Sequence, residues 1–375
     1  MSLQLTNFNL YKNQDMNGAF KLGTIKGIGV FIHWTFSLLI IYIIYINYSG
    51  GQNLIETLWS ILFVLSIFVT VILHELGHSF AAMRYNIKTK DITILPIGGV
   101  ARLESMPEKP SEELVVAIAG PLVNIALALI TALFVTIPED DQLSESLIEG
   151  INAGNFFLNF LIVNIVLAVF NLIPAFPMDG GRIFRALLSM KLSRPLATKI
   201  AARVGQFLAL GFILLGFYSN PFLIVIGLFI LIGAQSESKY TKTKSMLSGY
   251  QVQDVLMTEY KSIAETDSIK TVVDIVLNSQ YHNFLVVRDG VPTGTLSRDE
   301  IIKALSKNGE SELVQNVMNR NLLFLDANQA LEDAYSLILK QELNLVPVMK
   351  KQELIGVVDK ENILEFILFK EARLK

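Results

Sequence analysis

The sequence predicts a polytopic α-helical membrane protein with about six transmembrane helices and a membrane-associated β-hairpin, followed by a soluble α/β module. Of its 375 residues, 52% are hydrophobic and only 17% are charged. A purely soluble protein rarely has this balance. The apolar residues gather in long runs before residue 236, whereas the remainder is mixed and contains an internal repeat. A net charge of -3 gives no indication of nucleic-acid binding, and the absence of cysteine excludes disulfides and thiolate ligands.

Candidate membrane spans are the apolar segments that approach the roughly 20 residues needed to cross a bilayer. They run over 28–48, 55–83, 112–137, 153–176, 197–217 and 220–235. Lys and Arg are absent from 49–54, 138–152 and 218–219 and gather in the other connections. Cytoplasmic loops carry the excess of Lys and Arg, so both termini are expected in the cytoplasm of a multi-pass cell-membrane protein.

Residues 92–103 form a segment between the second and third spans that is too short to cross the membrane. Pro96, Gly98 and Gly99 interrupt it, which favours a β-hairpin that dips toward the membrane. Irregular backbone at that depth needs protein or a water-filled cavity around it, so the hairpin indicates a polar cavity. The alternative is an ordinary surface loop.

His74, Glu75 and His78 lie near the predicted cytoplasmic end of the second span. Two histidines four residues apart share a helix face and can bind one Zn²⁺ ion, and Glu75 can act as general base on a water at that metal. So short a pattern also occurs by chance. Ionisable residues at bilayer depth cost about 2.5–3.5 kcal/mol each, however, which indicates that these three have a partner or a function.

A catalytic zinc site commonly has three protein ligands, so a further one is expected. Asp179 is the best candidate, because it follows the fourth span on the same, cytoplasmic side and the segment around it is broken by Pro174 and Pro177. The alternative is that Asp179 caps a helix starting near Gly181.

Asn171 and Asn124 are polar residues within predicted spans. Each can donate a hydrogen bond to a substrate carbonyl or to a developing oxyanion. Each can instead hold helices together, and from the residues alone this interpretation is favoured for both.

The predicted organisation is a tail, a membrane domain, a linker and a duplicated soluble module. The tail covers 1–27, the membrane domain 28–235, the polar linker 236–250 and the module 251–375, with halves at 251–309 and 310–370. Residues 252–257 are echoed by 314–318, and 283–297 by 345–359. Each half is expected to contain helix, strand, strand and helix.

With these motifs in order, the chain resembles the site-2 proteases, particularly those with a C-terminal pair of CBS domains. The resemblance covers nearly everything after residue 27 and rests on the HExxH pattern, the hairpin, and Asn-x-x-Pro-x-x-Pro-x-Asp-Gly-Gly at 171–181. It implies one Zn²⁺ per chain, bound by His74, His78 and Asp179, with Glu75 as base and Asn171 at the substrate. It further implies that Gly98 and Gly99 line the substrate path.

The resemblance also implies partners. Such enzymes cut membrane spans of other proteins, for example anchored transcription regulators or anti-sigma factors. CBS pairs often bind adenine nucleotides or form homodimers. The nucleotide positions here are Ser297 with Glu300, and Asp359 with Asn362; neither half matches the family pattern of Ser or Thr followed three residues later by Asp.

Two other functions fit part of the sequence. A transporter or channel gated by the CBS pair would explain the soluble module and the polar residues in the spans. It would not explain why Glu75 directly follows His74, or why Asp179 lies at matching depth. A catalytically inactive scaffold with a structural zinc ion would not require Glu75.

Overall fold

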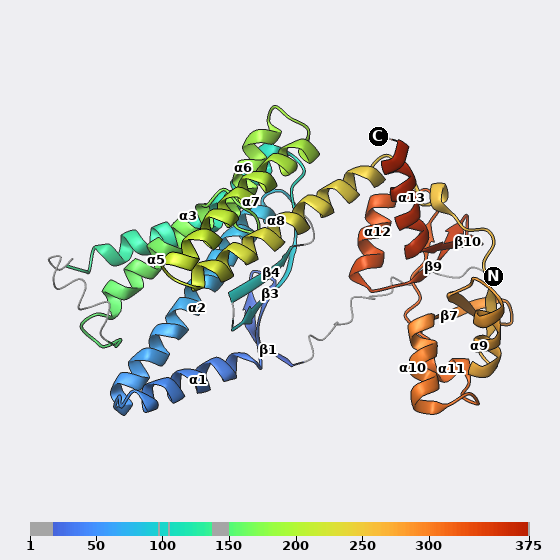
Figure 1. Cartoon of the computed structure of the whole chain (residues 1–375), viewed down its shortest axis with the longest axis horizontal. Helices are drawn as coiled ribbons and strands as arrows, with labels where there is room; N and C mark the ends of the chain where they lie inside the picture. Colours follow the sequence, from blue (N-terminus) through green and yellow to red (C-terminus); the bar gives the residue numbers. More distant parts are fainter. Residues whose placement is uncertain (1–17, 97, 104–105, 137–149, 374–375) are drawn as a thin grey trace. The chain divides into compact units, whose positions relative to one another are not determined.

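The structure is a computed structural model that describes residues 18–373 apart from 97, 104–105 and 137–149 (Figure 1). Most of the predicted tail and of the acidic connection after residue 137 lie outside the described residues. The chain divides into two compact units, with the boundary after Ser238.

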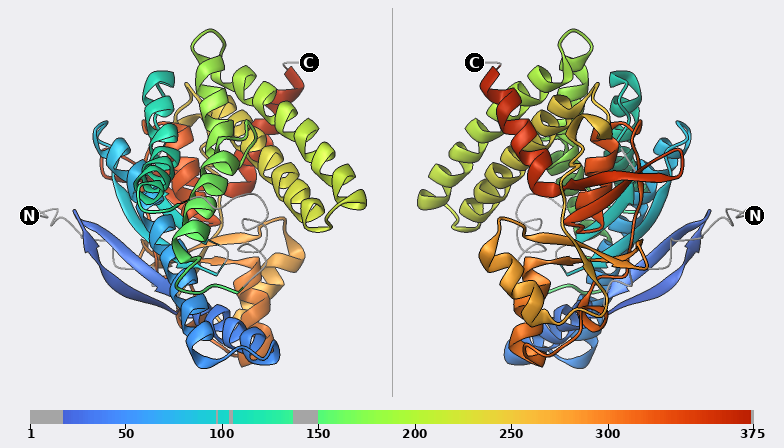
Figure 2. Two further views of the ribbon diagram at one scale, coloured as in Figure 1. Left: turned by 90° about the vertical axis from the view of Figure 1, so that its left-hand side faces the viewer. Right: turned by 90° about the vertical axis from the view of Figure 1, so that its right-hand side faces the viewer.

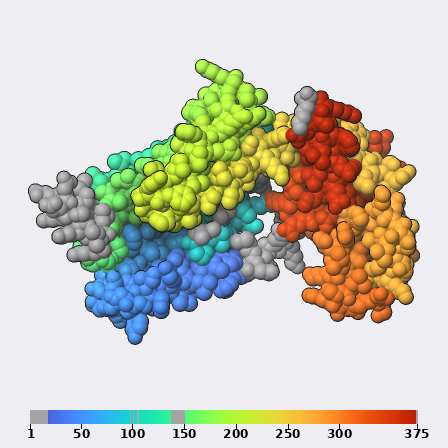
Figure 3. Space-filling view, in the orientation of Figure 1, coloured from blue at the N-terminus to red at the C-terminus, as the bar shows by residue number. Residues whose placement is uncertain are grey.

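The first unit is mainly helical. Its helices are α1 (Phe36–Ser49), α2 (Leu54–Met83), α3 (Pro110–Ala132), α5 (Phe156–Leu172), α6 (Asp179–Ser189), α7 (Arg194–Tyr218) and α8 (Phe222–Leu247). Among the described residues, α2, α3, α7 and α8 are long and apolar enough to cross a membrane, whereas α1 has 14 residues and α5 has 17. Apolar side chains are exposed on these helices, for example Ile41 and Tyr45 of α1. Figure 3 shows the N-terminal part of the chain, which contains α1, in blue. This apolar surface suits a lipid environment, and six spans remain a prediction.

A four-stranded sheet accompanies these helices. Its strands are β1 (Ala19–Ile25), β2 (Ile28–His33), β3 (Thr89–Leu95) and β4 (Gly98–Leu103), in the order β1-β2-β3-β4. The predicted hairpin is confirmed as the antiparallel pair β3–β4, in which Gly98 has φ +138°, a conformation that favours glycine. β2 pairs with β3 in parallel, so β4 is an edge strand within the described sheet.

The start of the first predicted span is wrong. Residues 28–33 form β2, and part of the predicted tail forms β1. A turn at Lys26 and Gly27, both with positive φ, joins the two strands. The apolar run of β2 is half buried against β3 and α2 and is not part of a helix. Composition alone does not distinguish a short apolar strand from the start of an apolar helix.

The predicted linker at 236–250 is helical for most of its length. Helix α8 continues through these residues as far as Leu247. Glu, Lys, Met and Leu in this segment are good helix formers, and it contains no Gly or Pro before Gly249, whose φ is +82°. The polar composition therefore marks the end of an apolar surface and not the end of a helix.

The second unit is the predicted duplication. The first repeat has η1 (Val252–Val255), β5 (Ser262–Ala264), α9 (Ile269–Asn278), β6 (Asn283–Arg288), β7 (Val291–Ser297) and α10 (Arg298–Asn308); the second has α11 (Val314–Val317), β8 (Leu325–Asp326), α12 (Leu331–Lys340), β9 (Leu345–Lys350), β10 (Glu353–Asp359) and α13 (Lys360–Arg373). Each repeat adds a short strand, β5 or β8, to the predicted elements, and each has its own three-stranded sheet. The two cores exchange residues: Val252 and Val255 of the first repeat lie in the core of the second, and Val314 and Met318 of the second lie in the core of the first. Leu285, Leu345 and Val357 form an apolar cluster between the repeats.

Helix α3 is central in the first unit, where it packs against α2, α5 and α6. Figure 2 shows α2 in blue and α3 in teal. The two helices approach closely at Gly77, where a Cβ atom would lie 2.8 Å from the Ala119 carbonyl oxygen and 2.9 Å from Val123 Cγ2. Glycine at position 77 permits this approach.

We therefore expect Gly77→Ala to destabilise the protein by about 1–3 kcal/mol, because an inserted methyl group forces the backbones of α2 and α3 apart. Thermal unfolding in detergent measures this. Gly211→Ala in α7 is the matched control, since a Cβ there would meet nothing within 4 Å. An equal midpoint for Gly77→Ala and Gly211→Ala would contradict the close packing of α2 on α3.

Candidate metal centre

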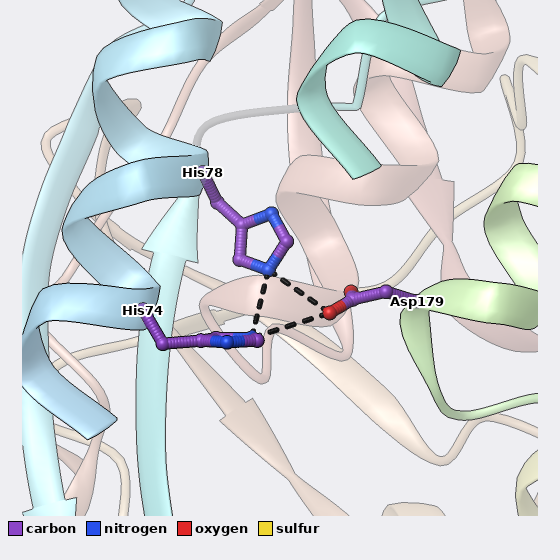
Figure 4. A group of neighbouring side chains, drawn as sticks. All are labelled: His74, His78 and Asp179. Carbon is purple, nitrogen blue, oxygen red and sulfur yellow. Dashed lines mark hydrogen bonds and ion pairs between the residues drawn. The ribbon is translucent and has the colours of Figure 1, made fainter. Parts of the chain in front are cut away.

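Three buried side chains from two helices meet at one point (Figure 4). His74 and His78 come from α2, and Asp179 is the first residue of α6. The two Nε2 atoms are 3.1 Å apart, and Asp179 Oδ2 lies 3.2 Å from His74 Nε2 and 3.1 Å from His78 Nε2. Among the described residues, these three form the group of His, Asp and Glu side chains suited to a metal ion.

Helix α3 fixes the orientation of both imidazoles. His78 Nδ1 donates to the Val116 carbonyl at 2.8 Å, and His74 Nδ1 donates to Asn124 Oδ1 at 2.5 Å. In the neutral form of each ring, with the proton on Nδ1, both Nε2 atoms present lone pairs toward the Asp179 carboxylate. The residue between these partners is Gly120, where a Cβ would lie 2.2 Å from His78 Nε2. Val116, Gly120 and Asn124, four residues apart, therefore form the helix face behind the histidines.

The donor set fits zinc. Two neutral imidazoles and a carboxylate are common ligands of catalytic zinc, and a tetrahedral ion with bonds of about 2.0–2.1 Å holds its ligands about 3.3 Å apart. The three observed separations lie close to that value. Three ligands leave a fourth position for water or substrate.

The local sequence explains why Asp179 faces the histidines. Gly180 lies so close to the end of α5 that a Cβ would be 2.2 Å from the Ile173 carbonyl oxygen. The helix cap is Met178, so the alternative role of Asp179 as a cap is wrong. Arg182, one turn along α6, places Nη1 3.8 Å from Asp179 Oδ1.

Glu75 lies beside the hairpin. A Cβ at Gly99 would be 3.4 Å from Glu75 Cγ and 2.6 Å from Val71 Cγ1, so β4 passes directly against this part of α2. Gly99 thus permits the close approach of the edge strand to the predicted base. Gly98, at the start of β4, lies at the turn of the hairpin.

The two predicted asparagines occupy different positions. Asn124 is buried, and its amide is bound at both ends, by His74 and by Asn164 Oδ1 at 3.4 Å. Asn171 lies in the last turn of α5 and donates to the Leu167 carbonyl of the same helix at 2.9 Å. The contacts of Asn124 favour a role behind the histidine over contact with substrate. The Val116 carbonyl was not singled out from the sequence, because no motif contains it.

In the second unit, Ser297 and Glu300 line a polar pocket with Asn283, Thr295, Asn319 and Asn344. Ser297 caps α10 and donates through Oγ to the Glu300 carboxylate at 2.8 Å. Asp359 accepts from the Asn283 amide, which joins the two repeats, and from the Glu361 backbone. Burial raises the pKa of the Asp359 carboxyl, and these hydrogen bonds oppose the shift.

Comparison with known proteins agrees with this geometry. The sequence profile of peptidase family M50 matches residues 62–212, and the CBS domain profile matches 252–307 and 314–369. A zinc metalloprotease of Methanocaldococcus jannaschii is 33% identical over 361 residues, covering 96% of this chain and 98% of that protein. Stage IV sporulation protein FB of Bacillus subtilis is 30% identical over 130 residues, which is 34% of this chain and 41% of that protein.

A solved structure, the site-2 protease from Methanocaldococcus jannaschii, is 38% identical and aligns over 59% of this chain and 95% of that chain, with a TM-score of 0.41. The similarity to the full-length archaeal metalloprotease extends across both units described above. The chain therefore belongs to peptidase family M50, the site-2 proteases, and carries a CBS pair after its peptidase domain.

Proposed function

We propose that this protein hydrolyses peptide bonds in or near the membrane spans of other proteins, with one Zn²⁺ held by His74, His78 and Asp179. The observation that carries this proposal is the convergence of three lone-pair donors, two of which lie with Glu75 on the apolar helix α2. A bound zinc ion supplies the acidity that activates a water molecule and polarises the scissile carbonyl. Glu75, next to the ligands and beside β4, accepts the proton of the attacking water.

The other parts of the site have supporting roles in this proposal. The Asn171 amide, which is half-buried at the end of α5, stabilises the developing oxyanion once it turns away from the Leu167 carbonyl. A substrate helix must unwind locally to expose a carbonyl, and the free edge of β4 at Gly98 and Gly99 can hold it as an added strand. Asn124 orients His74.

The rival functions explain less of the geometry. A gated transporter gives no reason for two Nε2 atoms and a carboxylate to meet within 3.2 Å. A zinc scaffold without activity gives no reason for Glu75 to lie beside the edge strand β4. The proposal extends to the orientation predicted from the Lys and Arg distribution, with the metal site near the cytoplasmic face and both termini in the cytoplasm.

The pocket at Ser297 and Glu300 is the place where we propose that the CBS pair takes an adenine nucleotide. The Glu300 carboxylate is already bound by the Ser297 backbone and hydroxyl, so a ribose would compete with this capping interaction. In the second repeat Asp359 occupies the position of Ser297, and Asn362 occupies that of Glu300. We also propose that the CBS pair forms a homodimer. The proposed substrate is a membrane-anchored transcription regulator or anti-sigma factor.

We expect Glu75→Gln to retain zinc but to lower the cleavage rate of a single-span substrate by at least about 10²-fold, because the amide cannot accept the proton. Zinc content and cleavage are measured on the same purified samples. Glu56→Gln is the control, since it makes the same chemical change in the first turn of α2 and can keep the capping box with Asn53. Unchanged cleavage by Glu75→Gln would exclude Glu75 as the base.

Asn124→Leu should weaken zinc affinity about 10–100-fold, because His74 loses the partner that fixes its tautomer and ring orientation. Competition with a zinc-binding dye measures the affinity. Asn159→Leu in α5 is the control, since Asn159 bonds only within its own helix in the described structure. A raised KM with unchanged zinc affinity would instead assign Asn124 to substrate binding.

AMP, ATP or S-adenosylmethionine at a concentration about 100-fold above its Kd should stabilise the second unit by about 2.7 kcal/mol. Differential scanning fluorimetry of the whole protein detects this as a raised unfolding midpoint. The shift should fall in Ser297→Ala and persist in Ser306→Ala, a change on the exposed surface of α10. No shift with any of the three ligands at millimolar concentration would contradict nucleotide binding.

A further inference from the structure

A buried ionic cluster lies close to the metal centre but contains none of its ligands. Arg185 of α6 donates through Nε to Glu113 Oε1 of α3 at 2.8 Å and through Nη1 to Glu237 of α8. Arg194 of α7 completes the cluster, with Nη2 3.2 Å from Glu113 Oε2. The Arg185 and Glu113 side chains are only 2% and 1% exposed. Two cations thus balance two carboxylates where four helices meet.

Such a cluster is costly to build. Each buried charge loses several kcal/mol of hydration, and well-packed apolar residues often stabilise a fold equally well. What the ions supply in addition is directional geometry, because the guanidinium group binds carboxylates in fixed directions. The cluster therefore fixes the relative positions of the helices that it joins.

Those helices carry the two halves of the metal site. Glu113 precedes Val116, Gly120 and Asn124 on α3 by three, seven and eleven residues, so it lies on the face that orients the histidines. Arg185 lies six residues after Asp179 in the short helix α6. The Glu113–Arg185 pair thus ties the helix behind His74 and His78 to the helix that presents Asp179.

Helix α8 contacts the same short segment. Gly233 of α8 lies against Pro177, where a Cβ would be 2.5 Å from the proline ring, and Ile230 packs with Met178. Glu237 is one turn further along α8 and binds Arg185. Helix α8 therefore contacts the chain on both sides of Asp179.

We propose that Arg185, held between Glu113 and Glu237, is a positioning residue that sets the distance between Asp179 and the histidine pair. This inference rests on the proposed zinc site. Its consequence is that loss of the cluster weakens metal binding although no ligand changes.

The test is the zinc affinity of the full-length protein in detergent, measured by competition with a chelating dye, together with thermal unfolding of the metal-free protein. Asp179→Ala should abolish binding, which shows that the dye reports this site. Arg185→Gln should raise the zinc Kd at least about 10-fold, in the range found for groups that orient metal ligands. Arg185→Lys should recover part of the affinity, because one ammonium group cannot bind both carboxylates in the same fixed directions.

Two further variants separate positioning from stability. Arg102→Gln removes the guanidinium that binds Asp91 within the β3–β4 hairpin and should leave the zinc Kd unchanged. Glu113→Gln combined with Arg185→Met leaves neither member of the central pair charged, so it should unfold near the wild-type temperature while the Kd stays raised.

A wild-type zinc Kd in Arg185→Gln, or in the double variant, would overturn the inference. If the wild-type protein binds zinc normally, that result leaves the proposed function intact. If the wild-type protein itself binds no zinc, the proposed function fails and this inference fails with it.

Discussion

Three lone-pair donors that meet within 3.2 Å set the main constraint on the first unit. In their neutral form the two imidazoles present lone pairs to the carboxylate, and a cation placed among the three groups stabilises all of them. The acceptors on α3 enforce this arrangement, because the Val116 carbonyl and the Asn124 amide oxygen keep the proton of each ring on Nδ1. The site is therefore prepared for a metal by groups that do not touch it.

This constraint explains the close packing around the site. Gly77 and Gly120 allow α2 and α3 to approach until the histidines reach their acceptors, and Gly180 allows α6 to start against the end of α5. The buried pair Glu113–Arg185 then joins α3 to α6. Small residues bring the elements together and charged residues fix their positions, which is how helices pack where lipid gives little hydrophobic driving force between them.

The sequence was sufficient where chemistry depends on local spacing. His74, Glu75 and His78 form a recognisable pattern, and breaks at Pro174 and Pro177 marked Asp179 as the partner. It was insufficient where no motif or helix break marks a distant partner: Arg185 and Glu113 are 72 positions apart, and only the fold brings them together. Residues 28–33 form a strand inside an apolar run, because pairing with neighbouring elements outweighs composition there. Helix α8 continues into a polar segment, because helix propensity outweighs composition there.

The most direct test of the account is X-ray absorption at the zinc edge of the purified protein, combined with its zinc stoichiometry. The account predicts one ion per chain, with two imidazole nitrogens and oxygen ligands at about 2.0–2.2 Å. It also predicts that Asp179→Ala loses that signal. A protein that holds no zinc, or whose zinc spectrum lacks two imidazoles, would contradict the central claim.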